Sequence, residues 1–283
     1  METRMLPAHR LPRPTAGLAT PPGVAKALDE ADILGMVRRA IARQDVLLAF
    51  QPVISPHHPE APAFYEGLIR VLDETGRIIP ARHFIKTVEP TALGREIDCL
   101  ALEMGFYSLS RDPSLRLSIN MSAQSIGHPR WRRVLEQGLA GDGTAGERLI
   151  LEISEASVLL MPDPVTALMA DLQPSGISFA LDDFGAAYSL LRHLRDFLFD
   201  ILKIDGQFIR GIAANPDNQV LTKALIDIAR HFEMLTLAES VESAADADYL
   251  AGIGIDGMQG HYYGAATMTP PWEPAFADCS ATA

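Results

Sequence analysis

The sequence has few cysteines and no surplus of positive charge, and each absence excludes a class of protein. Two cysteines among 283 residues, Cys99 and Cys279, are too few for a disulfide framework or a four-cysteine metal site, so we predict a reducing, cytoplasmic location. The formal net charge of -12 excludes a non-specific binder of nucleic-acid polymers, because such proteins need basic surface to neutralise phosphates. A phosphate-bearing ligand must therefore be bound by local groups.

Long apolar runs are absent as well. The first residues include Arg4, Arg10 and several prolines where a signal peptide needs an uninterrupted apolar stretch, and no later run is long enough to cross a bilayer. We therefore predict no membrane association. Proline-rich composition predicts a disordered leader over residues 1–25 and a flexible C-terminal tail over 269–283, which leaves residues 26–268 as a single folded domain.

Helical and strand-like patterns alternate through this domain. Apolar residues recur three or four positions apart from Ile33 to Ile41 and from Leu93 to Met104, which predicts helices with one buried face. Short apolar runs rich in β-branched and aromatic residues separate the helical stretches and predict buried strands. These runs are Leu47–Ile54, Phe64–Val71, Leu115–Asn120, Leu149–Ser154, Ile177–Asp182, Ile201–Asp205, Leu235–Glu239 and Met258–Tyr263. Strands alternating with helices in about eight units predict a (β/α)8 barrel of the α/β class.

Several of the predicted strands contain or end in a carboxylate or an amide. These residues are Glu66, Asn120, Glu152, Asp182, Asp183 and Glu239. Any one of them, taken alone, is more often a paired structural group than a functional one. The C-terminal ends of parallel barrel strands meet on one face, however, so the repetition predicts that these side chains share one basin. Carboxylates gathered there would repel one another unless cations lie among them.

The candidate ligands are oxygen atoms, because no histidine or thiolate belongs to the set. Oxygen donors favour the hard ions Mg²⁺ and Mn²⁺ over zinc. Among the eight histidines only His261 lies near a predicted strand end, and we interpret the others as surface or loop residues. Lys203 is the one lysine inside a strand-like run. Since an unpaired ammonium is costly to bury, we expect Lys203 to pair with the carboxylates.

A series of short motifs follows the predicted strands in a fixed order. They are Gln51-Pro52, Glu66-Gly67-Leu68 with Arg70, Asn120-Met121-Ser122, Glu152-Ile153-Ser154-Glu155, Asp182-Asp183-Phe184-Gly185, Lys203-Ile204-Asp205, Glu239-Ser240-Val241-Glu242 and Gln259-Gly260. Together they resemble the motifs of the EAL-type cyclic di-GMP phosphodiesterase domain, a modified (β/α)8 barrel, over roughly Val37 to Ala265. The resemblance implies a hydrolase that cleaves this bacterial second messenger.

Carried over position by position, the resemblance implies two metal ions, Mg²⁺ or Mn²⁺, and their ligands. The first ion would be bound by Glu66, Asn120, Glu152 and Asp182. Asp182 would bridge to the second ion, which Asp183 also holds. Glu239 and Gln259 would complete the shell or hold its waters. Lys203 would lie beside the attacking water, so the catalytic residues implied are Lys203, Glu239 and Glu66.

The resemblance also implies residues that hold the substrate and the loops. Arg70 would contact a phosphate through its planar fork of donors. The other implied substrate contacts are Gln51, Leu68 and Asp205. Glu155 and Glu242 would anchor loops, Glu155 the loop after Asp183. Two cations roughly 3.5–4 Å apart would generate hydroxide near neutral pH and offset charge on the attacking and leaving oxygens, so that water opens cyclic di-GMP to linear pGpG.

Several positions depart from the usual family pattern. Gly67 replaces the alanine of the signature tripeptide, which is a small-for-small change that leaves the neighbouring ligand in place. Ala186-Ala187 replaces Thr-Gly in the loop after the aspartate pair, which removes a hydroxyl and a residue that adopts positive φ freely. Ser240 replaces a glycine, and Ala265 stands near the usual proline.

Two alternatives to an active phosphodiesterase stay open on the sequence. The altered loop is consistent with a catalytically weak or inactive cyclic di-GMP receptor that passes the signal to an unidentified partner. A barrel lyase would instead form a Schiff base on Lys203, although that reading leaves the aspartate pair and Asn120 without a role. We also predict a homodimer through a helix-like stretch at Tyr188–Phe197, for which an ordinary amphipathic core helix is the alternative.

Overall fold

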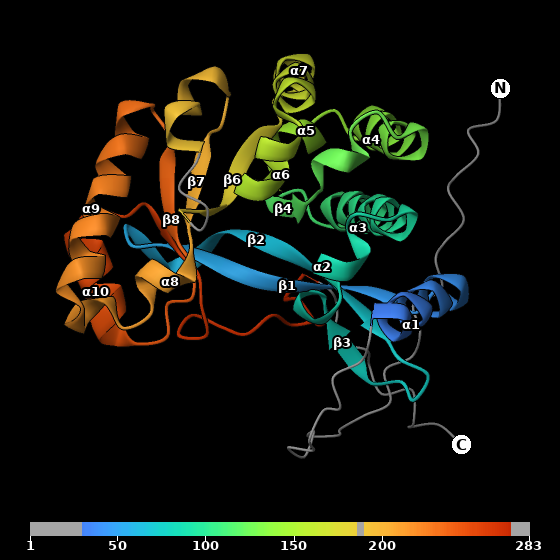
Figure 1. The fold of residues 1–283 in the computed structure, drawn as a ribbon, viewed down its shortest axis with the longest axis horizontal. Helices are drawn as coiled ribbons and strands as arrows, with labels where there is room; N and C mark the ends of the chain where they lie inside the picture. The colour runs from blue at the N-terminus through green and yellow to red at the C-terminus, as the bar shows by residue number, and fades with distance from the viewer. Residues whose placement is uncertain (1–29, 186–189, 273–283) are drawn as a thin grey trace.

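The alternating patterns of the sequence form a barrel of strands wrapped by helices (Figure 1). The computed structural model describes residues 30–185 and 190–272. The strands are β1 (Val46–Ser55), β2 (His58–Leu72), β3 (Ile78–Pro80), β4 (Leu117–Asn120), β5 (Leu149–Ser154), β6 (Ser178–Phe184), β7 (Ile201–Ile204), β8 (Leu235–Ala238) and β9 (Gly257–Met258). The α-helices are α1 (Glu30–Arg43), α2 (Ile85–Val88), α3 (Ala92–Arg111), α4 (Pro129–Gly141), α5 (Ala145–Arg148), α6 (Glu155–Leu160), α7 (Pro162–Leu172), α8 (Gly206–Ile209), α9 (Pro216–His231) and α10 (Ala244–Gly252).

The barrel is closed by the strand order β1, β2, β4, β5, β6, β7, β8, β9, with β3 extending the sheet beyond β2. Neighbours from β2 round to β9 run parallel, whereas β1 is antiparallel to both of its neighbours. β1 and β2 form a hairpin because only residues 56 and 57 separate them, which is too few for a crossover helix. β1 meets β9 at a single residue pair, Ile54 with Met258. The predicted barrel is therefore confirmed, in a modified form whose first strand is reversed.

Both predicted helical stripes lie on helices whose apolar faces are buried. Met36, Val37 and Ala40 are buried on α1, and Leu93 and Ile97 are buried on α3. α3 begins after Thr91, whose side-chain oxygen accepts the Leu93 N–H and so satisfies one of the free donors of the first turn. Within the described residues, no helix is long and apolar enough to cross a membrane.

Two sequence predictions were wrong in their details. The strand predicted at Met258–Tyr263 ends at Met258, because the chain then turns so that the Tyr262 N–H can donate to the Val241 carbonyl over 3.1 Å. The helix-like stretch at Tyr188–Phe197 forms two short 3₁₀ turns, Leu190–Arg192 and Leu194–Asp196, in its described part. Its first two residues lie outside the described residues.

The predicted domain boundaries are partly covered by the structure. Packing continues past residue 268, since the ring of Trp272 lies against Phe50 and Tyr65, with ring centroids 5.0 and 4.7 Å apart respectively. The predicted leader over residues 1–25 and the rest of the predicted tail, residues 273–283, lie outside the described residues.

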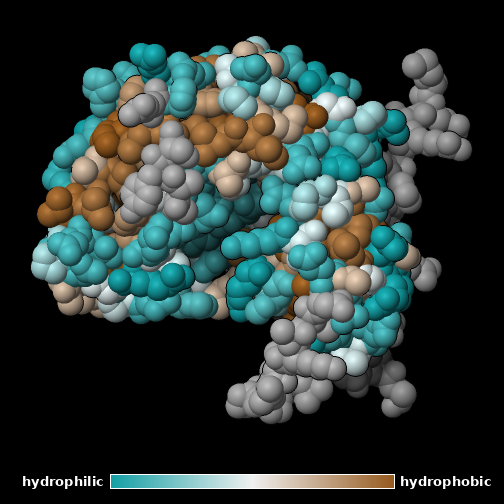
Figure 2. All heavy atoms as spheres, in the orientation of Figure 1, coloured by the Kyte–Doolittle hydropathy of each residue, from teal (hydrophilic) through white to brown (hydrophobic). Residues whose placement is uncertain are grey.

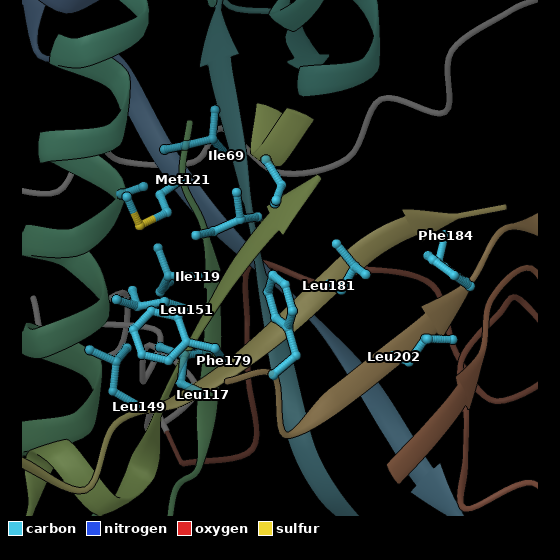
Figure 3. Packing of buried hydrophobic residues seen from close by; sticks show 14 of the residues in the cluster. Ile69, Leu117, Ile119, Met121, Leu149, Leu151, Phe179, Leu181, Phe184 and Leu202 are labelled. Atoms are coloured by element: carbon cyan, nitrogen blue, oxygen red, sulfur yellow. The ribbon is translucent and has the colours of Figure 1, made fainter. Parts of the chain in front are cut away.

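Apolar side chains pack on both sides of the barrel wall. The larger core fills the space between the strands and the surrounding helices, and Figure 3 shows Leu117, Ile119, Leu149 and other strand residues projecting into it. The smaller core fills the barrel interior. Its members are Val53, Phe64, Ile150, Ala180, Ile201 and Leu237. Because side chains alternate along a strand, the residue two positions along from each interior apolar residue also faces the interior.

Candidate active site

A layer of polar side chains lies directly above the apolar interior of the barrel. Two positions after Phe64, Ile150, Ala180, Ile201 and Leu237 come Glu66, Glu152, Asp182, Lys203 and Glu239. On the reversed strand β1 the same step runs backwards, from Val53 to Gln51, and Gln51 is paired in register with Glu66. Asn120 and Gln259 complete the layer at the ends of β4 and β9. The structure thus brings together all the strand-end residues that the sequence predicts to share a basin.

Lys203 lies at the centre of this layer. Its Nζ is 2.6 Å from Glu152 Oε2, 2.8 Å from Glu239 Oε1, 3.0 Å from Asp182 Oδ1 and 3.3 Å from Glu66 Oε2. The contact with Glu66 crosses the barrel, because β7 and β2 are not neighbours in the sheet. Lys203 and Glu152 are each 1% exposed. The expectation that a buried Lys203 pairs with carboxylates is confirmed.

Two amides connect to the same carboxylates. Asn120 Nδ2 donates to Glu66 Oε1 over 2.7 Å, and Gln259 Nε2 donates to Glu66 Oε2 over 2.7 Å. Glu66 thus accepts hydrogen bonds from the end of β4, from the residue that follows β9 and from Lys203 across the barrel. Its carboxylate is held in one orientation from three directions.

Crowding and burial raise the pKa of several of these carboxyl groups. Burial and the charges of Glu66 and Asp182 raise the pKa of Glu152 to about 8, although Lys203 opposes the shift. Burial also raises the pKa of Glu239 well above its usual value, again against the effect of Lys203. For Lys203 burial alone would lower the pKa, but the surrounding carboxylates outweigh burial and raise it well above the usual value. The carboxylates therefore need more positive charge than one ammonium supplies.

A sharp bend in β6 brings two consecutive aspartates to the site. Alternation along a regular strand would send Asp183 to the opposite side from Asp182. Instead, the pairing of β6 with β7 shifts register between Leu181 and Phe184, and Asp183 adopts a left-handed φ of 55°. Carboxylate oxygens of Asp182, Asp183 and Glu239 consequently lie within 4.8 Å of one another. Partial burial and the charges of Asp182 and Asp205 raise the pKa of Asp183 to about 6.

The side chains present fit divalent cations by their charge and by their unused oxygen atoms. Five carboxylates, Glu66, Glu152, Asp182, Asp183 and Glu239, surround the single ammonium of Lys203, which leaves four negative charges when all are ionised. Two divalent cations would carry an equal and opposite charge. Among the described residues, Glu152 Oε1 and Gln259 Oε1 are buried acceptors without a hydrogen-bond donor. Buried oxygens of this kind normally have a partner, and an all-oxygen donor set suits Mg²⁺ or Mn²⁺.

The loop after Glu239 is packed tightly against the turn that carries Gln259. A Cβ atom on Gly260 would lie 2.1 Å from the Val241 carbonyl oxygen, so only glycine fits there. The Val241 N–H donates to the Gln259 carbonyl over 2.9 Å. Ser240 adopts a left-handed φ of 58°, which explains why the family usually has glycine at this position. Its hydroxyl accepts a hydrogen bond of 2.9 Å from Arg210 Nη2.

Three predicted substrate contacts lie on the hairpin of β1 and β2. Leu68 and Arg70 follow Glu66 at intervals of two on β2, so they share its face, and both are half-buried. Gln51 Nε2 donates to the Gly264 carbonyl over 3.1 Å. Burial and the nearby charge of Arg82 lower the pKa of Arg70.

Arg82 is a residue that the sequence reasoning missed. It lies in the 3₁₀ turn Ala81–His83, directly after Pro80, and Pro80 pairs with Arg70 in the sheet. The pairing of β3 with β2 brings this second guanidinium near Arg70. The sequence pattern could not indicate this, because β3 is only three residues long and carries no strand signal of its own.

The remaining predicted residues lie at the edge of the site. Asp205 caps α8, where its carboxylate accepts the Gln207 N–H over 2.7 Å. Glu155 is buried, and its two carboxylate oxygens accept the N–H groups of Gly185 and Leu190, each over 3.1 Å. Glu242 is exposed and lies 3.6 Å from Arg210 Nε, outside the polar layer. The prediction that Glu242 anchors a loop stays a prediction. Of the altered loop, residues 186 and 187 lie outside the described residues.

Gly67 faces away from the site, between the barrel wall and the helices. A Cβ atom there would lie 2.7 Å from Ile119 Cδ1 and 3.1 Å from Leu48 Cδ2. Ile119 therefore uses the space that an alanine at position 67 would fill. Gly67 thus lies in the outer wall of the barrel, whereas the neighbouring Glu66 is buried in the polar layer.

The fold and the site together define a barrel with a carboxylate-rich, cation-compatible centre at the strand ends. A model of the EAL domain family matches residues 35–266, so the chain belongs to this family, as predicted. It is 28% identical over 240 residues to the cyclic di-GMP phosphodiesterase PdeF of Escherichia coli K12, an alignment that covers 83% of this chain and 32% of PdeF. The chain spans about a third of the length of the curated relatives it matches.

Solved structures share the same fold. The EAL domain of FimX from Pseudomonas aeruginosa, bound to cyclic di-GMP, superimposes with a TM-score of 0.76 at 24% identity, covering 87% of this chain and all of that one. The manganese and cyclic di-GMP complex of BlrP1 from Klebsiella pneumoniae gives a TM-score of 0.68 at 24% identity, covering 79% of this chain and 56% of that one. At this level of identity the two structures establish the fold alone.

Proposed function

We propose that the chain is a metal-dependent phosphodiesterase that hydrolyses cyclic di-GMP to linear pGpG. The observation that carries the proposal is the cluster of five carboxyl groups around the single ammonium of Lys203, together with the buried oxygens of Glu152 and Gln259 that have no hydrogen-bond donor. Membership of the EAL family and the phosphodiesterase activity named for PdeF support the choice of reaction. The structure of BlrP1, a complex with manganese and cyclic di-GMP, supports the choice of cofactor and substrate.

Two Mg²⁺ or Mn²⁺ ions would be held by Glu66, Asn120, Glu152, Asp182 and Asp183, with Glu239 and Gln259 completing their surroundings. Bound there, such ions lower the pKa of water and offset charge on the oxygens that attack and leave phosphorus. The Asn120 and Gln259 amides fix the orientation of Glu66. For Asn120 and Gln259 to serve as ligands, their carbonyl oxygens would face the ions while their NH₂ groups keep these hydrogen bonds.

The chain's own cations would hold the substrate and the water. Arg70 would bind a phosphate, and Gln51, Leu68 and Asp205 would line the nucleotide near it. Lys203 would remain protonated, because the carboxylates raise its pKa, and would orient the attacking water through Nζ–H. The water oxygen would bond to phosphorus as the bond from phosphorus to the 3′ oxygen breaks. The proton that the water loses would be balanced by the one that the leaving 3′ oxygen takes up. Asp183, held at the bend of β6, would be fixed in turn by the loop that Glu155 anchors.

The test is to incubate the purified chain with cyclic di-GMP in Mg²⁺ or Mn²⁺ and to chromatograph the nucleotides. We expect pGpG from the wild type and none from Glu66→Ala or Asp182→Asn. Asp227→Asn is the matched control, because Asp227 is an exposed carboxylate of α9 paired with Lys223, and it should leave turnover unchanged. Unaltered hydrolysis by Glu66→Ala or Asp182→Asn would refute the ligand assignment.

A receptor without turnover is the second candidate, and the same assay distinguishes it. The Ala186-Ala187 loop is the observation that favours it, because it departs from the family pattern next to Asp183. Saturable cyclic di-GMP binding without pGpG in either metal would establish the receptor. A Schiff-base lyase is disfavoured, because a nucleophilic amine must lose its proton and the carboxylates around Lys203 raise its pKa.

We further propose that the chain forms a homodimer through an apolar surface beside the site. Figure 2 shows a broad apolar area on the side of the molecule where Figure 1 places α6 and α9, next to a hollow lined by hydrophilic residues. The exposed large apolar residues of α6, of α9 and of residues 190–198 between them are Leu159, Leu160, Leu191, Leu198, Val220 and Leu221. Patches of this kind commonly mark interfaces. Sedimentation should give a dimer at micromolar concentration that Val220→Glu disrupts, whereas a wild-type monomer would contradict the proposal.

A further inference from the structure

A buried carboxylate on α3 is bonded to the turn that follows β4. Asp98 is 6% exposed, and its Oδ2 accepts the Ser122 N–H over 3.0 Å and the Ser125 hydroxyl over 2.5 Å. Ser122 lies two residues after Asn120, and Ser125 ends the 3₁₀ turn Ala123–Ser125. Asp98 therefore fixes the path that the chain takes on leaving the end of β4.

The same turn is bonded on its other side to α6. The Ser157 hydroxyl oxygen accepts the Ala123 N–H over 2.8 Å and lies 3.5 Å from the Ser122 hydroxyl. Ser157 is 5% exposed and Ser122 is 6% exposed, so little water competes for these bonds. Buried polar groups without partners are costly, so the turn is stabilised in this one arrangement.

The helix that holds this turn also holds the loop after the aspartate pair. Glu155, two residues before Ser157 on α6, accepts the N–H groups of Gly185 and Leu190, each over 3.1 Å. One short helix is thus bonded to both segments that leave the site, one after Asn120 and the other after Asp183. A shift of the first segment relative to α6 would change the distance between Asn120 and the aspartate pair.

We propose that Asp98 and Ser157 are positioning residues, which keep Asn120 and the Asp182–Asp183 pair at the separation that binding of a divalent cation requires. Neither residue belongs to the polar layer, and each acts through the turn between them. The inference rests on one part of the proposed function, namely that the site binds a divalent cation, and does not depend on the reaction. A purely structural role would alter stability without altering cation affinity, which makes the two roles separable.

The test compares Ser157→Ala with a matched control, Ser108→Ala. Ser108 is a buried serine of α3 whose hydroxyl donates to the Met104 carbonyl within the same helix, so its loss leaves the turn after β4 intact. Mn²⁺ affinity is measured by titration calorimetry and by the loss of the free-ion electron paramagnetic resonance signal, and stability is measured by urea unfolding. We expect Ser157→Ala to weaken Mn²⁺ binding about tenfold, as loss of an outer-sphere hydrogen bond does at other metal sites. Ser108→Ala should leave Mn²⁺ affinity unchanged.

Variants of Asp98 test the same inference independently, in case Ser157→Ala folds poorly. Asp98→Asn keeps an acceptor oxygen and should retain Mn²⁺ affinity within about threefold of the wild type, whereas Asp98→Ala should lose about tenfold. Equal Mn²⁺ affinity in Ser157→Ala, Asp98→Ala and the wild type would overturn the inference, and so would absence of Mn²⁺ binding by the wild type. Mn²⁺ binding by a wild type that makes no pGpG would instead overturn the proposed reaction and leave the inference standing.

Discussion

The two layers of side chains inside the barrel lie on the same strands, but burial of the lower layer lowers the free energy of the fold and burial of the upper layer raises it. The lower layer, which includes Ile150 and Leu237, removes apolar surface from water and stabilises the fold. The upper layer, which includes Glu152 and Lys203 two residues further along its strands, buries charges whose attraction must offset a large loss of hydration. A regular strand places both layers with the same ease. The difference teaches that the barrel supplies positions, and that the residue type at each position decides whether it stabilises or binds.

Among the changes that test this comparison, loss of the Lys203 ammonium at the centre of the upper layer should have the largest effect on stability. Lys203→Met keeps an unbranched side chain that is one atom shorter, but leaves Glu66, Glu152 and Glu239 without their shared partner. We expect the free energy of unfolding without metal to fall by about 3–5 kcal/mol at pH 8, and by less at pH 5, where more of these carboxyls are protonated. Urea unfolding at the two pH values measures the loss. Lys223→Met, which removes an exposed partner of Asp227, should cost under about 1 kcal/mol.

The upper layer should also make stability depend on pH when no metal is bound. The pKa of Glu152 is raised to about 8 and that of Asp183 to about 6, so between about pH 4 and pH 8 the folded state keeps protons that the unfolded state releases. Stability should therefore fall by several kcal/mol as pH rises from 5 to 8. Added Mn²⁺ replaces the protons of the upper layer and should reduce the fall. The part due to Asp98 should remain, because burial raises the pKa of this carboxyl outside the layer to about 7. Thermal or urea unfolding across pH checks both statements, and a metal-free stability that rises toward pH 8 would contradict them.

A change in the lower layer should affect stability and leave metal binding alone. Ile150→Val removes one methylene from the apolar interior directly below Glu152. We expect a loss of about 1 kcal/mol, because the neighbours only partly close the cavity. Mn²⁺ affinity should match that of the wild type. A weakened affinity would show that the two layers are not independent.

The smallest effect is expected at the strained edge of the upper layer. Ser240→Gly removes a side chain from a residue with a left-handed φ of 58°, which glycine adopts without penalty. It also removes the acceptor of the Arg210 hydrogen bond, which is exposed and contributes little. The net gain in stability should be about 0.5 kcal/mol, measurable as a shift of the urea midpoint. A loss would indicate that the bond from Arg210 outweighs the backbone strain.

The sequence predicts the barrel and the polar layer because both follow from local patterns. Apolar runs such as Leu149–Ser154 coincide with the observed strand, and alternation places Glu152 inside once Ile150 is inside. The ordered motifs then imply which polar residues meet. These predictions depend only on the spacing along each strand and on the convergence of parallel strands at one face.

The features that the sequence did not predict depend on contacts between distant segments. The reversal of β1 follows from the short link to β2, and the position of Arg82 follows from the pairing of Pro80 with Arg70. The bend at Asp183 needs a positive φ that the residue type alone does not indicate. Asp98 lies in the middle of a helix, where an acidic residue gives no signal that its partners are 24 and 27 residues away.

The single residue pair that joins β1 to β9 makes this seam the weakest part of the barrel wall. Most other neighbouring strands of the ring share three or more pairs. Beyond its pair with β9, β1 makes one further bridge to the chain that follows, between Phe50 and Thr267. Regions with few backbone bonds open at the lowest free energy, so amide hydrogens here should exchange with solvent sooner than those of β5 and β6. Gln259 follows Met258 directly, and each opening of the seam would therefore carry its amide away from Glu66. Water would then reach the charged interior of the barrel between the separated strands β1 and β9.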